Sequence, residues 1–521
     1  MKKIFKIASV ITVVCVLICL CGCAGANRGQ TVYCDIGERI KTLDPQLVSS
    51  QSERNVVHNI FEGLTKLDKD GNPVLACAER YEKNGNTYTF YLKKELLWSD
   101  GSALSADDFV FGLRRAASAD TAAPDYNYVS IIKGADAVHS GASADNLAVT
   151  AKNEQTLSIT LNYDDGKLLY YLSKPICMPC NEQFFYSTNG KYGRDSDSII
   201  TNGAYYLRSW NSETYAVRLK RSEDYIGDNK AIPAAVYITS NDPESLNEKI
   251  SKGTIDVSYI KNSQTEIFKD SNLTLDKYFN KCWFIVINKN SQLGASDIRR
   301  ALSLSINRET RSASLPSYAL MLESVIPLGT AFGGENIYDA TKGNKNLSYN
   351  PLDAYALYSN ASKGISGPLS IIYPEEAGVE DVVTEIASCW QENLGCFINI
   401  SPVSDNDSIL STIKNGSYTV ALFSIDANEN DAFEFLQNFK SGNIFGFANS
   451  NFDTQLSELS TLSDKQSYVN KVNALQDILL SDHCIIPIIS TPLTLCYDDT
   501  ISNVSYNLKN GYIDFGEIIK K

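Results

Sequence analysis

Histidine is scarce in this chain of 521 residues, which has only His58, His139 and His483. A zinc site usually needs several histidines, or pairs of cysteines at short spacing. Beyond residue 23, the one tight cysteine pair is Cys177 and Cys180, and no second pair accompanies it there. We therefore expect no metal ion and no other cofactor. A redox or metal role for this pair is the alternative to burial as two small hydrophobic side chains.

The short motifs of common catalytic sites are also missing. The sequence has no H-E-x-x-H, no G-x-S-x-G and no G-x-x-x-x-G-K-[ST]. Acidic residues alone do not indicate a site, because 61 Asp and Glu residues make chance pairs common. We expect that the protein is not an enzyme; an exported hydrolase is the alternative.

Positive charge is in deficit, with 47 Lys and Arg residues and a net charge of −14. Such a surface repels phosphate backbones and anionic headgroups. Nucleic acid is therefore not an expected partner.

Long apolar runs are absent except near the N-terminus, where IASVITVVCVLICL follows Lys2, Lys3 and Lys6. This run has the length of a signal-peptide core and is too short for a membrane span with its flanks. Removal of residues 1–22 would take away three basic residues and no acidic one, and would change the net charge from −14 to −17. The pattern predicts an exported protein.

The end of this run, Leu20-Cys21-Gly22-Cys23, resembles the lipobox of bacterial lipoproteins. The resemblance implies cleavage before Cys23 and lipidation of its thiol, including a palmitate chain, followed by a polar spacer over residues 23–30. The alternative is an ordinary signal peptide cut within residues 24–26. We expect a protein held at the extracytoplasmic face of the cell membrane by its lipid alone.

Alternating apolar residues predict strands at residues 87–92, at 157–161 and at 215–219. Helices are predicted after Ser105, which precedes two acidic residues, and after Ser296. Asp297 and Arg299 are expected on a solvated face of the second helix. Because strands and helices interleave without strict order, the predicted class is α/β with large lobes.

Passages between lobes are predicted near residues 275–281 and 487–492. Two crossings would make the lobes discontinuous in sequence. A cleft between lobes is a common place for a ligand.

The stretch SIDANENDAFEFL, residues 424–436, opens like a calcium loop. An EF-hand that starts at Asp426 needs glycine at its sixth position and glutamate at its twelfth, where this chain has Asp431 and Gln437. The motif fails at both positions, and a different metal cage is the remaining metal alternative.

Several segments together resemble the extracytoplasmic solute-binding proteins of family 5, the oligopeptide- and dipeptide-binding lipoproteins of ABC importers. These segments are Leu43-Asp44-Pro45, residues 61–82, residues 92–111 with Trp98-Ser99-Asp100-Gly101, Thr201-Asn202-Gly203, residues 297–309 and residues 485–490. Trp98 to Gly101 and Thr201 to Gly203 are interpreted as structural turns rather than ligand contacts.

The resemblance implies a two-lobed, periplasmic-binding-protein-like α/β fold with a ligand cleft between the lobes. Residues 31–60, 175–280 and 491–521 would form lobe 1, residues 61–174 an additional domain packed on it, and residues 281–490 lobe 2. It also implies a monomer that closes its lobes on an oligopeptide and delivers it to the permease and ATPase subunits of an ABC importer.

In this family the peptide is bound largely through its backbone. By position, Ser49, Ser50 and Gln51 match the segment of the first lobe that pairs with the ligand. Ser424 and Ile425 begin the second such segment. An ordinary polar loop is the alternative for Ser49 to Gln51.

The family anchors the amino terminus of the peptide with an aspartate in a pattern like A-L-Y-G-W-x-A-D-Y-N-D-P-x-x-F-L. A gapless alignment of residues 421–436 places Asn428 at this anchor. A gap of two residues places Asp426 there instead. Both alignments stay open. Binding of a non-peptide solute such as a metal chelate or a saccharide, and peptide sensing at the cell surface, are the alternatives to import.

Overall fold

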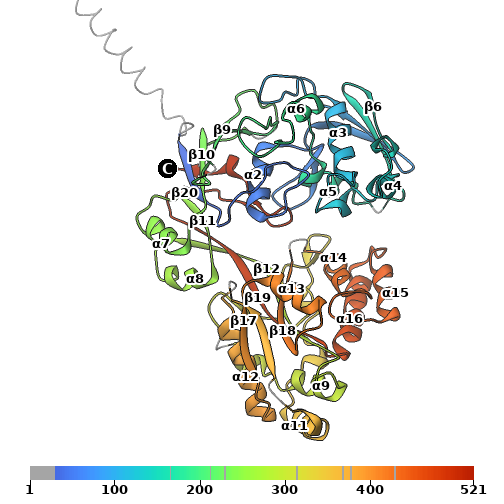
Figure 1. Cartoon of the computed structure of the whole chain (residues 1–521), viewed down its shortest axis with the longest axis vertical. Helices are drawn as coiled ribbons and strands as arrows, with labels where there is room; N and C mark the ends of the chain where they lie inside the picture. Colours follow the sequence, from blue (N-terminus) through green and yellow to red (C-terminus); the bar gives the residue numbers. More distant parts are fainter. Residues whose placement is uncertain are drawn as a thin grey trace, which may run out of the picture. The chain divides into compact units, whose positions relative to one another are not determined.

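The computed structural model describes residues 30–164, 166–211, 213–227, 230–312, 315–366, 369–375, 378–427 and 430–521. The signal peptide predicted at residues 1–22, the lipidation site at Cys23 and the anchor candidate Asn428 lie outside these residues. The chain splits into two compact units (Figure 1). Unit 1 comprises Met1–Asp242, Glu248–Val257 and Asp498–Lys521, and unit 2 comprises Pro243–Asn247 and Ser258–Tyr497. The lobe and domain boundaries expected from the sequence stay a prediction.

One sheet of unit 1 has the strand order β1-β10-β9-β8. Its strands are β1 (Thr31–Asp35), β8 (Tyr205–Trp210), β9 (Val217–Arg221) and β10 (Ala235–Thr239). β1 and β10 are parallel, and the other pairs are antiparallel. Val217 and Leu219 are buried, as the predicted alternation requires, but Tyr215 precedes the strand with a φ of 56°. The predicted strand therefore begins two residues too early.

The second sheet of unit 1 is antiparallel and has the order β4-β5-β7-β6. It contains β4 (Ala78–Asn84), β5 (Thr87–Leu92), β6 (Val149–Asn153) and β7 (Thr156–Thr160). The strands predicted at residues 87–92 and 157–161 are confirmed. Helix α3 (Ala106–Ala117) begins after Ser105, whose backbone N–H donates to Asp108 Oδ2 at 2.8 Å. This capping box confirms the predicted helix start.

The two motifs interpreted as turns are confirmed as structural. Gly101 has a φ of 85° and donates its N–H to Trp98 O at 2.9 Å, which closes a turn. The side-chain oxygen of Asn202 accepts a hydrogen bond from the backbone N–H of Glu62 at 3.1 Å. Its side-chain amide donates to the backbone carbonyl of Glu62 at 2.8 Å. A Cβ at Gly203 would lie 2.5 Å from the carbonyl carbon of Ile60, so only glycine fits beside this backbone.

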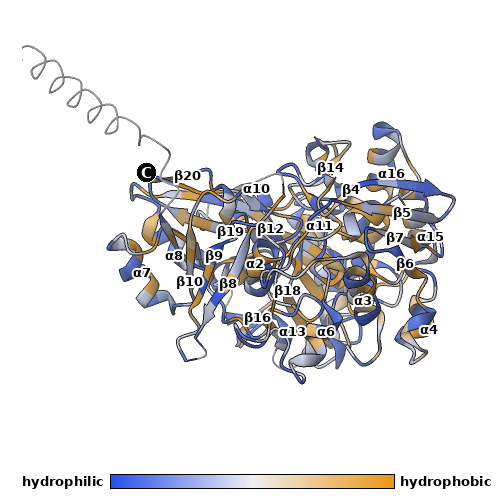
Figure 2. Ribbon diagram, turned by 90° about the horizontal axis from the view of Figure 1, so that it is seen from above, coloured by the Kyte–Doolittle hydropathy of each residue, from blue (hydrophilic) through white to orange (hydrophobic). Residues whose placement is uncertain are grey.

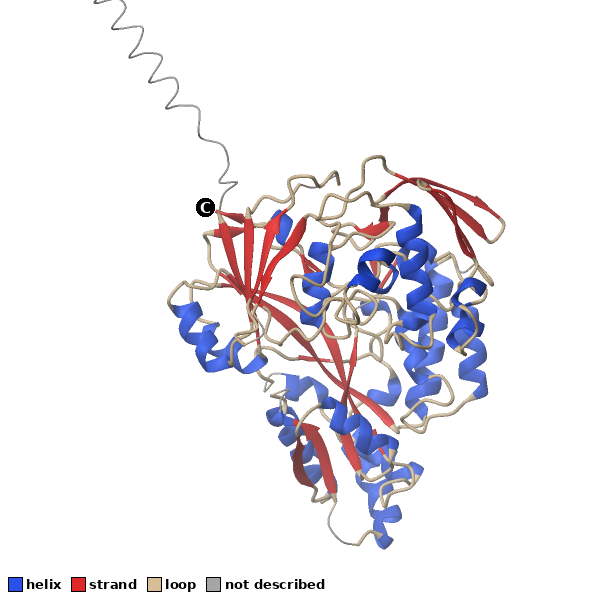
Figure 3. Ribbon diagram, turned by 45° about the horizontal axis from the view of Figure 1, so that its top comes forward, coloured by secondary structure: helices blue, strands red, loops and turns tan. Residues whose placement is uncertain are grey.

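The sheet of unit 2 has the order β17-β16-β18-β12-β19-β11. It contains β11 (Val257–Ile260), β12 (Thr274–Ile287), β16 (Ser370–Pro374), β17 (Asn399–Val403), β18 (Val420–Asp426) and β19 (Ile485–Tyr497); β13 (Leu320–Met321) also pairs with β19. The apolar runs Cys282–Ile287 and Val420–Ile425 are buried along their whole length. Such runs are typical of strands that are covered on both faces, and Figure 3 shows helices beside the strands of this unit.

The remaining elements are short strands and helices. The strands are β2 (Thr65–Leu67), β3 (Pro73–Leu75), β14 (Ala331–Phe332), β15 (Glu335–Asn336), β20 (Ile501–Ser502), β21 (Tyr506–Asn507), β22 (Tyr512–Ile513) and β23 (Ile519–Lys520). The helices are α2 (Gln51–Ile60), α4 (Ala135–His139), α5 (Leu168–Tyr171), α6 (Glu182–Ser187), α7 (Pro243–Ser251), α8 (Asn262–Phe268), α9 (Ser296–Leu304), α10 (Arg308–Ser312), α11 (Pro351–Ala361), α12 (Glu380–Leu394), α13 (Asn406–Lys414), α14 (Ala432–Leu436), α15 (Ser450–Leu459) and α16 (Lys465–Ser481). Hydrophobic and hydrophilic residues occur within the same helices (Figure 2), as expected for helices with one buried face. In the described part of the chain, no helix has both the length and the apolar character to cross a membrane.

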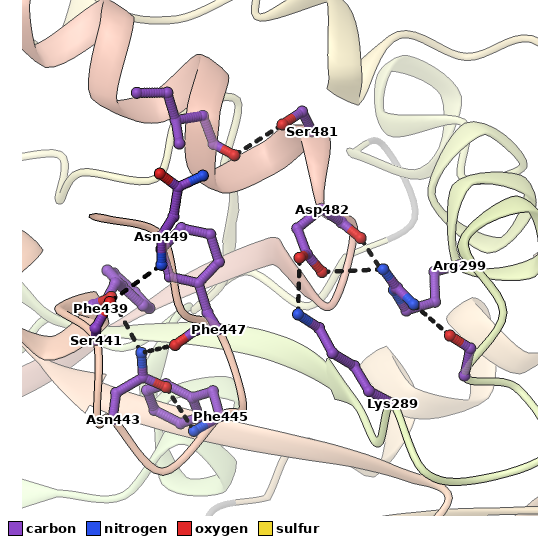
Figure 4. A network of polar contacts seen from close by, with 12 residues as sticks. Lys289, Arg299, Phe439, Ser441, Asn443, Phe445, Phe447, Asn449, Ser481 and Asp482 are labelled. Carbon is purple, nitrogen blue, oxygen red and sulfur yellow. Dashed lines mark hydrogen bonds and ion pairs between the residues drawn. The ribbon is translucent and has the colours of Figure 1, made fainter. Parts of the chain in front are cut away.

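The exposure expected for Arg299 on α9 is wrong. Asp297 is exposed as predicted, but Arg299 is only 8% exposed and pairs with Asp482 at 3.1 Å. Lys289 approaches the other carboxylate oxygen of Asp482 at 2.7 Å (Figure 4). This cluster joins the ends of β12 and α16 to α9. The sequence pattern missed it because Asp482 lies 193 residues from Lys289 and 183 residues from Arg299.

All nine cysteines of the described residues are free and buried. Burial raises the pKa of the Cys177 thiol, and it raises the pKa of Cys180 to about 12. Thiols of this kind are protonated at neutral pH and are poor nucleophiles. Within the described ranges, no cluster of three or more His, Cys, Asp or Glu side chains has the geometry of a metal site.

Candidate functional site

Ser424, Ile425 and Asp426 form the carboxyl end of β18 in unit 2. They pair in antiparallel register with Trp283, Cys282 and Lys281 of β12. Ser424 and Ile425 are buried, whereas Asp426 is exposed. Because side chains alternate along a strand, Ser424 and Asp426 share one face of the sheet. The strand therefore carries a carboxylate to the surface directly beyond a buried segment.

One edge of β18 is occupied by β12. A hydrogen bond of Ala427 shows which backbone groups of β18 point toward β12. The backbone N–H of Ala427 donates to Asn280 O at 2.7 Å, toward β12. In an antiparallel ladder the backbone groups of successive residues point to opposite edges. Those of Ser424 and Asp426 therefore point away from β12.

The other edge of β18 lacks a strand over this part of its length. β16 pairs only with Val420 and Ala421, and among the described residues no strand pairs with residues 422–426 on this side. Ser424 is held there by the side chain of Asn406, through hydrogen bonds of 3.4 and 3.5 Å. An extended chain that displaced these long bonds would find a short open strand edge that ends at Asp426.

Several residues from Asn430 to Leu436 have roles in the fold. Asp431 accepts the backbone N–H of Glu434 at 3.1 Å and caps α14, and Phe435 and Leu436 are buried in the core. The backbone carbonyl oxygen of Asn430 accepts a hydrogen bond from the backbone N–H of Ala331 at 2.8 Å. Of the acids that the structure describes in this stretch, Asp426 is the one that belongs to β18.

Ser49, Ser50 and Gln51 lie at the start of α2 in unit 1. The backbone N–H groups of Ser49 and Ser50 donate to Glu53 Oε2 at 3.0 and 3.1 Å, and the hydroxyl of Ser50 accepts the backbone N–H of Glu53 at 3.2 Å. Gln51 donates its side-chain amide to the hydroxyl of Tyr506 at 3.2 Å. The two serine amides are thus engaged within unit 1, and so is the carbonyl of Ser50, which accepts the backbone N–H of Arg54 at 3.1 Å.

Two side chains that position the candidate segments, Glu53 and Asn406, escaped the sequence reasoning. Glu53 collects four backbone N–H groups, those of Lys41, Thr42, Ser49 and Ser50, at 3.0 to 3.2 Å. The spacing of Ser50 and Glu53 is that of a capping box, so the sequence does carry this signal. Asn406 lies 18 residues before Ser424 and has no local signal, because its role depends on tertiary packing.

The sequence model of the bacterial extracellular solute-binding proteins, family 5 (middle region), matches residues 72–447. The chain is 25% identical over 493 residues to a dipeptide-binding protein of Lactococcus lactis, an alignment that covers 89% of this chain and 88% of that protein. It is also 25% identical over 469 residues to the probable deoxycholate-binding periplasmic protein YgiS of Escherichia coli, with 87% and 86% covered.

Among solved structures, the substrate-binding domain of an oligopeptide ABC transporter from Bacillus anthracis superposes with a TM-score of 0.76 and 21% identity, covering 94% of this chain and 99% of that one. This likeness shows that the chain has the mixed α/β fold of periplasmic solute-binding proteins. The match to more than half of its length shows further that it belongs to family 5 of the bacterial extracellular solute-binding proteins, as the resemblance predicted.

Proposed function

We propose that this protein binds an extended peptide along the open edge of β18 and delivers it to the permease and ATPase subunits of an ABC importer. The observation that carries the proposal is the strand edge at residues 422–426, where the described residues hold the backbone of Ser424 through two long bonds from Asn406. A peptide added there would bond through its backbone, so its side chains could vary. The names of the dipeptide-binding relative and of the oligopeptide transporter support this class of ligand.

Asp426 is the proposed partner of the amino terminus of the peptide. An ammonium group that leaves water needs a compensating negative charge. Asp426 is exposed at the end of the strand, and among the described residues no ion pair occupies it. Asn428, which lies two residues further along, is the alternative partner.

Calorimetry with a tetrapeptide and its N-acetylated form tests this assignment. Asp426→Asn should lower the affinity for the free peptide about tenfold or more, as expected for a lost charge-assisted hydrogen bond. It should leave the affinity for the acetylated peptide unchanged. Asp431→Asn is the matched control, because Asn also caps a helix. Full affinity in Asp426→Asn together with a loss in Asn428→Ala would assign the anchor to Asn428.

A non-peptide solute is the second candidate ligand, because one relative is named for deoxycholate binding. Native mass spectrometry of the protein purified from its source distinguishes the candidates by the mass of any bound compound. Peptides would support import or sensing, and a metal chelate, saccharide or steroid acid would contradict the peptide proposal. A gene neighbourhood without permease and ATPase genes would favour a surface sensor.

The proposed attachment to the extracytoplasmic face of the membrane rests on the lipobox-like residues 20–23. Metabolic labelling with palmitate should mark the wild-type protein and not Cys23→Ser. Labelling of both proteins would contradict lipidation at Cys23. Light scattering during size-exclusion chromatography tests the proposed monomer, and lobe closure stays a prediction.

A further inference from the structure

Unit 1 contains a cavity of about 530 Å³ that the peptide proposal does not use. We call it the Asp514 cavity. It is lined by the end of α2, the hairpin of β2 and β3, Tyr225 and the C-terminal segment from Ser505 to Glu517. Every lining residue belongs to unit 1, whereas the edge of β18 belongs to unit 2. Its volume lies within the range of small-molecule sites.

The lining of the Asp514 cavity is predominantly acidic. Four carboxylates, those of Glu62, Asp68, Asp514 and Glu517, line it together with two ammonium groups, those of Lys66 and Lys69. Lys66 pairs with Glu62 at 3.2 Å, and the hydroxyl of Tyr225 donates to the same carboxylate oxygen at 2.7 Å. The charge of Glu62 is therefore compensated within the protein.

Asp514 also lines the cavity, and the charge of Lys66 and the backbone N–H of Glu517 stabilise its carboxylate only in part. Its Oδ1 accepts the backbone N–H of Gly516 at 2.9 Å, and no Lys or Arg of the described residues forms an ion pair with it. Burial and then the charge of Glu517 raise the pKa of Asp514. A cation placed beside this carboxylate would relieve both effects.

The position of Asp514 is held on both sides. The backbone N–H groups of Ile513 and Phe515 donate to Asn55 at 2.6 Å and to Asn59 at 3.0 Å, and both asparagines belong to α2. Ile513 and Phe515 are fully buried. The carboxylate is thus carried by a rigid part of unit 1.

Two polar atoms of the cavity lining are buried without a hydrogen-bond partner. Asn510 is 5% exposed and donates its amide to Ser173 O at 3.4 Å, which leaves its Oδ1 as an unpaired acceptor. His58 Nε2 is also unpaired, and burial, followed by the charges of Lys174 and Arg54, lowers the pKa of His58 to about 3. The imidazole is therefore neutral and adds no positive charge to the lining.

An unpaired amide oxygen, a neutral imidazole and a carboxylate that has no ion pair within the described residues together match a ligand that donates hydrogen bonds and carries positive charge. From this juxtaposition we propose that the Asp514 cavity binds a small organic cation with a primary ammonium group. This site is separate from the proposed peptide site and does not depend on it.

Saturation-transfer NMR and calorimetry with pentylamine, pentan-1-ol and pentanoate test the proposal on the full protein. Pentylamine should bind, and it should bind at least about tenfold more tightly than the alcohol or the acid. Equal affinity for the amine and the alcohol, or no binding of the amine at millimolar concentration, would overturn it. These titrations need no variant.

Three variants locate the bound amine. Asp514→Asn should weaken pentylamine binding about tenfold, and an asparagine can still accept the N–H of Gly516. Asp498→Asn is the matched control, because Asp498 makes the same kind of turn with Thr500 at 2.8 Å and does not line the cavity. Asp426→Asn should also leave amine binding unchanged. A loss in Asp426→Asn without a loss in Asp514→Asn would show that the amine occupies the peptide site, and would overturn the proposal.

Discussion

Asp44, in the segment Leu43-Asp44-Pro45, forms a buried ion pair with Arg115. Arg115 of α3 approaches both carboxylate oxygens of Asp44, at 2.6 and 3.3 Å, and it also donates to Gln46 at 2.6 Å. The side chains of Asp44 and Arg115 are 3% and 10% exposed. The pair therefore fixes the start of unit 1 onto α3, and its energy depends on both charges being present.

Asp44→Asn should lower the free energy of unfolding of unit 1 by about 3 to 5 kcal/mol, because Arg115 would remain buried without its counter-charge. Urea denaturation measures this loss. Asp125→Asn is the control, since Asp125 and Arg54 form a more exposed pair at 3.3 Å, and its loss should be below about 1 kcal/mol. Equal effects of the two substitutions would contradict the importance of burial.

Other single residues show how much of the fold and of the candidate site could be predicted from the sequence. Local rules predicted the helix start after Ser105, the turn at Gly101 and the alternating strand β5, because each depends on neighbours within a few positions. The exposure of Arg299 was wrong, and the role of Asn406 was missed, since their partners lie 183 and 18 residues away. Tertiary partners of this kind leave no local pattern.

Among the elements, α9, α16 and β12 of unit 2 are joined by the carboxylate of Asp482. It accepts hydrogen bonds from Lys289 at 2.7 Å and from Arg299 at 3.1 Å. Burial alone would raise the pKa of Asp482, but the hydrogen bond from Lys289 and the nearby positive charges lower it overall. The folded state therefore prefers the ionised carboxylate more strongly than the unfolded state does.

Asp482→Asn should destabilise unit 2 by about 1 to 3 kcal/mol at neutral pH. The stabilisation from a depressed carboxyl pKa is present above the unfolded value of about 3.9 and is lost as pH falls through the folded value. The difference between wild type and variant should therefore shrink below about pH 4.

Urea denaturation over this pH range tests the assignment, with Asp297→Asn on the exposed face of α9 as control. The stability difference of the control should stay below about 1 kcal/mol, the most that an exposed carboxylate in the first turn of a helix contributes. A difference between wild type and Asp482→Asn that stays constant into acid would show that the substitution acts through packing and not through charge.

At the scale of the whole molecule, the net charge of −14 should affect the association rate of a ligand more than its affinity. A negative protein attracts basic peptides over a distance of about 10 Å at 0.1 M salt. Backbone pairing at the edge of β18 would not discriminate between peptide side chains. Under the proposed function, the charge of the peptide should therefore change mainly the association rate.

Two tetrapeptides that differ only in two internal residues, both Lys or both Glu, test this expectation by stopped-flow measurement. The lysine peptide should associate several-fold faster at about 0.02 M salt, and the ratio should fall toward one at about 0.5 M salt, where the Debye length is only a few ångströms. The two dissociation rates should stay similar. A ratio that does not change with salt, or a difference confined to dissociation, would mean that the side chains meet specific charged groups when bound. In that case the selectivity of the site would come from local contacts and not from the overall field of the protein.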